Sequence, residues 1–130
     1  MKRILFLCCI AIASTCTVAM AQSGPSTITT QPNPKTLFNS HVGKFDAGIA
    51  RSNTAMAQAG FTEAMSFISN SITQLQQQIQ SASSKANKAA LTTKMQAQQQ
   101  IYTDLQALQS NIVSNAAQIK NKFNAFEAVM

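Results

Sequence analysis

The sequence has 130 residues, a formal net charge of +6 and only 11% charged residues. That length allows one domain at most. The basic residues are spread along the chain and never form a run denser than Lys120-x-Lys122. A nucleic-acid-binding surface requires a denser basic patch, so we expect no nucleic-acid partner.

The first 21 residues have the pattern of a cleaved secretory signal peptide. Two basic residues precede an apolar run of about nine residues at positions 4–12, within the roughly 7–15 that a signal core has. Residues 19–21, Ala-Met-Ala, provide a small-x-small cleavage site. A membrane-spanning helix needs roughly 20 apolar residues, which this run does not reach. We predict removal of residues 1–21, a mature start at Gln22, and a secreted or periplasmic destination.

The positions of the cysteines indicate whether the signal carries a lipid-attachment site and whether the mature chain can form disulfides. Cys16 lies near the cleavage site, but Ala13 and Thr15 do not match the leucine and small residue that normally precede a bacterial lipid-attachment cysteine. Because Cys8 and Cys9 lie in the same segment, the predicted mature chain has no cysteine and no disulfide. Small exported domains without disulfides need long regular helices or self-association to be stable.

Residues 22–40 read as a flexible tail. They contain all three prolines of the chain among Ser, Thr, Gln and Asn, and proline removes backbone donors and disfavours helix in the residue before it. We expect the helical domain, residues 41–130, to begin near positions 41–45, with Asn39 or Ser40 as the cap.

Apolar residues then recur at helical spacing. After Phe45, Ile49 and Met56 the stripe shifts phase at Gly60, and we expect one helix that passes through this glycine with a local irregularity. Beyond it the steps alternate between four and three in the following series: Phe61, Met65, Ile68, Ile72, Leu75, Ile79 and Ala82.

A stretch without large apolar residues, 81–90, divides this stripe from a second one. We place a turn at residues 83–87, with Asn87 in a left-handed position and Ser83 or Ser84 capping the next helix. The second stripe has a seven-residue spacing through Leu91, Gln98, Leu105, Ile112, Ile119 and Phe126. No segment alternates at period two, so the predicted fold class is all-α.

Two arms of nearly equal length follow, at about 44–82 and 88–128. Folding one arm on the other pairs positions that sum to about 171, and this register predicts a long antiparallel helical hairpin or coiled coil. The same register collects four aromatic residues at the open end: Phe38, Phe45, Phe123 and Phe126. Two alternatives remain, a single long helix in a parallel coiled coil and a three-helix arrangement that breaks at Gly60.

The stripes are wider than a simple two-helix seam, and the extra apolar residues predict an interaction face. Burying one such side chain is worth roughly 1.5–3 kcal/mol, which favours a second hairpin docking alongside to form a four-helix bundle. Gln98, a polar residue at a seam position, is predicted to fix register or oligomeric state. The predicted interaction face consists of Phe67, Ile101, Leu108, Val113, Phe123 and Phe126.

The predicted mature chain has few residues suited to catalysis or metal binding. It has one histidine, His41, and four widely dispersed carboxylates, whereas a zinc site needs three or four ligands. Ser40 and Asp46 lie close to His41 in sequence, but no glycine-rich loop or nucleophile motif accompanies them. We predict no enzyme, no cofactor and no catalytic or metal-binding residue.

The strict seven-residue repeat favours contacts between helices, because a lipid-facing helix needs no fixed seam. We predict an exported, non-enzymatic helical protein that acts through protein–protein contacts, as a structural or assembly component of an extracytoplasmic, secretion or surface apparatus. Its partner would be a second copy of the chain or another exported protein. The alternative is an amphipathic lipid-binding or membrane-surface protein whose hairpin opens toward lipid.

Overall fold

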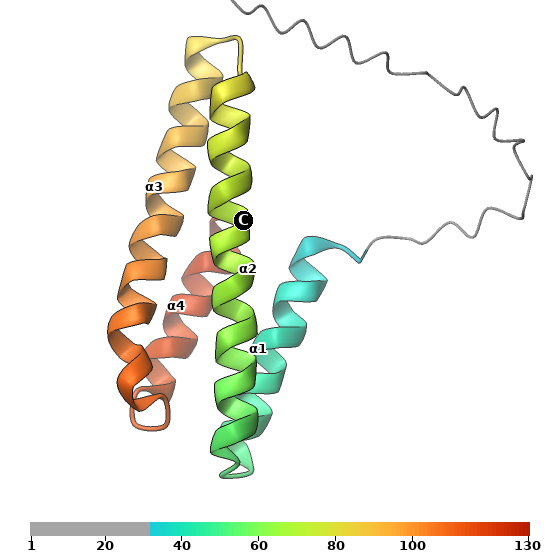
Figure 1. The fold of residues 1–130 in the computed structure, drawn as a ribbon, viewed down its shortest axis with the longest axis vertical. Coiled ribbons are helices and arrows are strands. Elements are labelled where there is room, and N and C mark those ends of the chain that lie inside the picture. Colours follow the sequence, from blue (N-terminus) through green and yellow to red (C-terminus); the bar gives the residue numbers. More distant parts are fainter. Residues whose placement is uncertain (1–31) are drawn as a thin grey trace, which may run out of the picture. The chain divides into compact units, whose positions relative to one another are not determined.

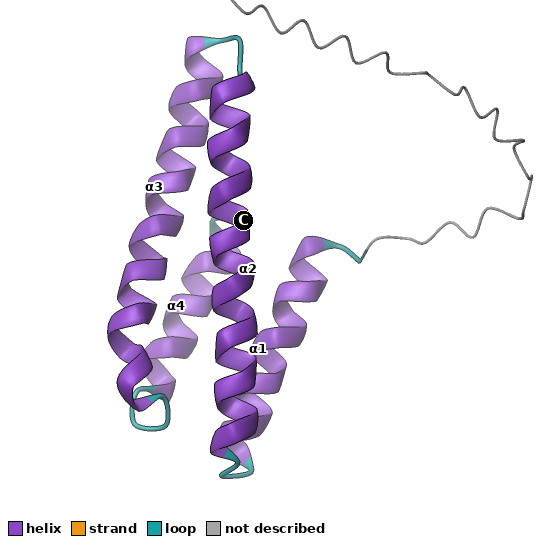
Figure 2. Cartoon of the chain, in the orientation of Figure 1, coloured by secondary structure: helices purple, strands orange, loops and turns teal. Residues whose placement is uncertain are grey.

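The computed structural model describes residues 32–130, which form an all-α fold without a strand in that range (Figures 1 and 2). This confirms the predicted fold class. The predicted signal peptide, its cysteines and residues 22–31 of the predicted tail lie outside the described residues. The helices, with one short 3-10 helix labelled η1, are α1 (Pro34–Ala50), α2 (Thr54–Ser81), α3 (Lys85–Leu108), η1 (Gln109–Asn111) and α4 (Ala116–Ala128).

The central turn lies between α2 and α3, close to its predicted position. It spans residues 82–84, and the Ser84 side chain accepts a hydrogen bond of 3.1 Å from the Asn87 backbone N–H. Ser84 is therefore the cap of α3, as one of the two predicted choices. Asn87 lies in the first turn of α3 and does not take the left-handed position that we expected.

The first helix begins earlier than expected. Pro34 occupies the first turn of α1, and the Asn33 side chain accepts a hydrogen bond of 3.0 Å from the Lys35 backbone N–H. Proline suits this position because its φ is already helical and its missing N–H would have no partner there. The sequence interpretation treated the proline as a sign of an extended tail and placed the start near His41.

The break between α1 and α2 comes at residues 51–53 and not at Gly60. Ser52 has a left-handed backbone (φ 52°), and the Asn53 side chain accepts a hydrogen bond of 2.9 Å from the Met56 N–H. Asparagine at this position caps the new helix. The predicted continuous helix through residues 44–82 is therefore wrong, and so is the expected irregularity at Gly60, which lies inside α2.

Gly60 instead permits close packing of α1 on α2. A methyl group at Gly60 would overlap the backbone of Phe45, and one at Gly48 would overlap the backbone of Ala57. Both glycines and Ala57 are buried. Glycine lowers intrinsic helix propensity, but here its missing side chain lets two backbones approach.

A second break separates α3 from α4. The chain passes through η1 and a turn, where the Asn115 side chain donates to the Leu108 carbonyl (3.0 Å) and Asn111 accepts from the Ser114 N–H (3.2 Å). The chain then turns back along α3 as α4. The predicted second arm, 88–128, is thus two helices, and its seven-residue repeat persists because Ile112 in the turn is also buried.

The core is built around phenylalanine. Phe38 and Phe126 have ring centroids 4.8 Å apart, and Phe45 meets Phe123 edge to face at 5.6 Å. The predicted gathering of Phe38, Phe45, Phe123 and Phe126 is confirmed, but it arises because α1 folds back on α2 and α4 folds back on α3, which brings α1 and α4 into contact. Phe61 and Phe67 join the same cluster.

Every side-chain carboxylate among the described residues forms an ion pair with a lysine of another helix. These pairs lower the pKa values of three carboxyl groups: Lys44 and then His41 act on Glu63, Lys122 on Asp104, and Lys35 on Glu127. The four pairs are Lys35–Glu127 (3.0 Å), Lys44–Glu63 (2.5 Å), Lys120–Asp46 (2.7 Å) and Lys122–Asp104 (2.6 Å).

Candidate functional site

The predicted interaction face is divided by the fold. Ile101, Phe123 and Phe126 lie buried in the core of their own chain. Phe67 and Leu108 are partly buried against that core. Val113, in the turn before α4, is 52% exposed. In this fold, three of the six residues are therefore not accessible to a second chain.

The structure gives His41 and Asp46 different partners. The His41 ring Nδ1 lies 3.1 Å from a Glu63 carboxylate oxygen, whereas Asp46 pairs with Lys120 of α4. Among residues 32–130 no three potential metal ligands of the His, Cys, Asp or Glu type lie together. None of the helices described is long and apolar enough to span a membrane.

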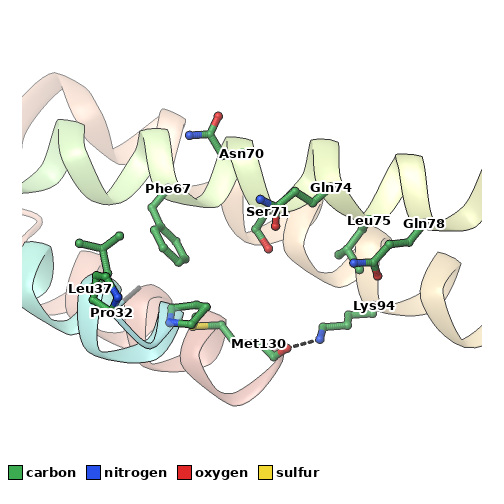
Figure 3. A pocket seen from close by; sticks show the side chains of 11 residues that line it. Pro32, Leu37, Phe67, Asn70, Ser71, Gln74, Leu75, Gln78, Lys94 and Met130 are labelled. Atoms are coloured by element: carbon green, nitrogen blue, oxygen red, sulfur yellow. Dashed lines mark hydrogen bonds between the residues drawn. The ribbon is translucent and has the colours of Figure 1, made fainter. Parts of the chain in front are cut away.

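A groove of about 520 Å³ lies where the start of α1 and the last residues of the chain meet the middle of α2 (Figure 3). It receives side chains from α2, one lysine from α3, and the segment at the start of α1. Its lining consists of Pro32, Pro34, Leu37, Phe67, Asn70, Ser71, Gln74, Leu75, Gln78, Lys94 and Met130.

One face of α2 forms the long wall of this groove. Its lining residues run from Phe67 to Gln78 at steps that keep them on one side of a helix. This face is accessible because α2 and α3 extend beyond α1 and α4 (Figure 1). Leu37 projects from α1 at the same place and is 39% exposed, although it is a large apolar side chain.

Two side chains of α3 hold the last residues of the chain beside the groove. The Lys94 ammonium donates a hydrogen bond to the Met130 carbonyl (Figure 3). Gln98 is fully buried; its side-chain oxygen accepts from the Ser71 hydroxyl (2.9 Å), and its amide nitrogen donates to the Val129 carbonyl (3.3 Å). Gln98 thus links α2, α3 and the last residues described.

Of the described residues that line the groove, Lys94 is the one with a charged side chain. Between Glu63 and Asp104 the chain contains no acidic residue, but it contains Lys85, Lys88 and Lys94. No side-chain carboxylate of the described residues lies within ion-pairing distance of these three lysines. Lys94 lines the groove itself.

The sequence interpretation missed the groove for identifiable reasons. The predicted flexible tail includes Leu37, whereas Leu75 is buried, as its place in the stripe predicts. Lys94 had no pattern around it that marked it as special. The signal that was present is the polar face of α2, where Asn70, Gln74 and Gln78 recur at four-residue steps.

No family model matches the chain, and neither the curated proteins nor the solved structures contain a significant match to it.

Proposed function

We propose that this chain is an exported, non-enzymatic helical protein that acts through protein–protein contacts, as a structural or assembly component of an extracytoplasmic, secretion or surface apparatus. The observation that carries the proposal is the groove along α2 between Phe67 and Gln78. The partner is another exported protein or a second copy of the chain.

The composition of the groove supports binding of a polypeptide. Phe67 and Leu37 provide apolar surface, and amide side chains of α2 stand beside them. Leu75 also lines the groove but is nearly buried, with 5% of its surface exposed. A mixed lining of this kind suits a helix that inserts apolar anchors and forms hydrogen bonds at its edges. Leu37 would gain most from being covered, because it is exposed in the free chain.

Export is supported by the pattern of residues 1–21. At an extracytoplasmic location, the chain would meet other exported proteins and membrane surfaces as possible partners.

Site-specific photo-crosslinking in the producing organism tests the proposal. The full chain carries a photoreactive amino acid in place of Gln78, at the groove. The control carries it in place of Gln106, which is also an exposed glutamine but lies near the end of α3 and does not line the groove. We expect discrete protein adducts at position 78 and few at position 106.

Other outcomes would overturn the proposal. Adducts with lipid alone at position 78 would support the amphipathic lipid-binding alternative. Absence of any adduct, or equal adducts at both positions, would remove the groove as a contact site.

A further inference from the structure

We propose that the groove along α2 binds an acidic amphipathic helix of another protein, with its apolar side on Phe67 and Leu37 and a carboxylate at Lys94. This inference rests on the proposed function and adds the chemistry of the partner.

The length of the groove fits a short helix. From Phe67 to Gln78 the wall spans eleven residue steps, which corresponds to about 16 Å at 1.5 Å per residue. A partner helix of about three turns covers that distance. Its apolar residues, spaced by three and four, would face the apolar residues of the groove.

The rim of the groove favours a polypeptide over lipid. Asn70, Gln74 and Gln78 are exposed amides along the wall. A polypeptide can satisfy their hydrogen bonds with its own polar groups, whereas acyl chains cannot, and leaving amides unpaired in an apolar environment is costly.

The positive charge of this chain favours an acidic partner over a second copy of the chain. The described residues contain eight Lys and Arg against four Asp and Glu, a net charge of +4. All four of these carboxylates are already paired with lysines of their own chain. A second copy would therefore bring net positive charge and no free acidic side chain to Lys94, and an acidic helix would bring the complementary charge.

Binding of three synthetic peptides to the processed full chain tests the inference by fluorescence anisotropy. The peptides share leucines at alternating steps of three and four, and they differ only in carrying Glu, Gln or Lys at the remaining polar positions. We expect the Glu peptide to bind about tenfold more tightly than the Lys peptide at low salt, with the Gln peptide between them. This preference should shrink at about 1 M salt, where the Debye length is near 3 Å.

A charge reversal identifies the lysine responsible. Lys94→Glu should reverse the order of the Glu and Lys peptides. Lys85→Glu is the matched control, because nine residues along a helix place Lys85 on the opposite side of α3 from Lys94. Lys94→Gln, which keeps a donor for the Met130 carbonyl, should reduce the preference about threefold and serves if the reversed variant fails to fold.

The outcomes separate this inference from the proposed function. Equal binding of all three peptides would overturn the acidic partner and leave a protein-binding groove. Concentration-dependent self-association that Lys94→Glu changes would assign the groove to a second copy. Binding to vesicles with anionic lipid, together with no peptide binding, would overturn both proposals.

Discussion

Gln98 shows what a single buried polar residue does in this small helical fold. It is the one fully buried polar side chain among the described residues, and both ends of its amide have partners. A buried amide costs little when its hydrogen bonds are formed, but its former partners lose them when it is replaced. The sequence pattern singled out Gln98 because an amide interrupts an apolar seven-residue series.

We expect Gln98→Leu to lower the free energy of unfolding by about 1–3 kcal/mol, because the Ser71 hydroxyl and the Val129 carbonyl lose their partner. Urea denaturation followed by circular dichroism measures the change. The matched control is Gln106→Leu at an exposed position of α3, which should stay within about 0.5 kcal/mol of the parent. Equal effects of the two variants would contradict a specific role of Gln98.

Acid should destabilise the fold through its ion pairs. Lys44, Lys122 and Lys35 hold the pKa values of Glu63, Asp104 and Glu127 below their ordinary values of 4.5, 3.8 and 4.5. The unfolded chain therefore takes up protons first as pH falls. The stabilisation is fully present above the ordinary pKa values and is lost as pH falls through the lowered ones.

Urea midpoints measured from pH 7 down to pH 3 check this prediction. Glu63→Gln removes one of the three groups, so its midpoint should fall less steeply with acidification than that of the parent chain. A parent midpoint that stays constant over this range would show that the ion pairs contribute nothing to stability.

At the scale of elements, two glycines of α1 and α2 have opposite tolerance for a methyl group. Gly60 faces the backbone of Phe45, whereas a methyl group at Gly43 would meet no atom of another element within 4 Å. We expect Gly60→Ala to destabilise the fold by about 1–3 kcal/mol through overpacking. Gly43→Ala should stabilise it by about 0.5–1 kcal/mol, because alanine is the better helix former.

Thermal melting of the two alanine variants checks this pair. Helix propensity alone would make both substitutions stabilising, so a higher melting temperature for Gly60→Ala would show that α1 and α2 do not approach closely at this point.

The sequence predicts which residues of the helices face the core better than it predicts where the helices begin and end. Periodicity located the residues that face the core, including the phenylalanines of distant segments, because burial requires one apolar side per helix. It could not locate the breaks at 51–53 and 109–115. Those depend on local hydrogen bonds of Asn53 and Asn115, and asparagine is too frequent in this chain for these two positions to stand out.

At the scale of the whole molecule, the two extra breaks in the helices change which surface covers the apolar residues that lie beyond a two-helix seam. Two long arms would leave Ile101 and Phe126 partly exposed and would need a second chain to cover them. Four helices cover them within one chain, with Phe38 and Phe126 in direct contact. The sequence therefore shows how wide the apolar stripe is. It does not show whether the same chain or a second chain covers the stripe, because this depends on where the loops lie.

The groove could not be predicted from the sequence, because the positions of the loops determine which segments meet there. Its residues come from both ends of residues 32–130 and from the middle of α2. Only the fold brings Leu37 next to Phe67, and no periodic pattern connects them.

The proposed export can be tested through processing of the 130-residue sequence. We expect the full chain, expressed in a Gram-negative host, to reach the periplasm or the medium with Gln22 as its first residue, because the small residues Ala19 and Ala21 suit signal peptidase. N-terminal sequencing and mass measurement check the site. Replacing Ala21 by arginine should block cleavage, whereas Cys16→Ser should not. Loss of processing in Cys16→Ser would instead indicate lipid attachment.

Pro32 and Met130 line the same groove, so the two ends of the described chain lie near each other. The α2–α3 turn at residues 82–84 lies at the end of α2 and α3 that projects beyond α1 and α4, and none of its residues lines the groove (Figure 1). The fold is therefore suited to circular permutation, with a short linker joining 130 to 32 and new termini opened in this turn. Such a rearranged chain would bridge the groove with the linker, which gives a way to close the site covalently without altering any residue that lines it.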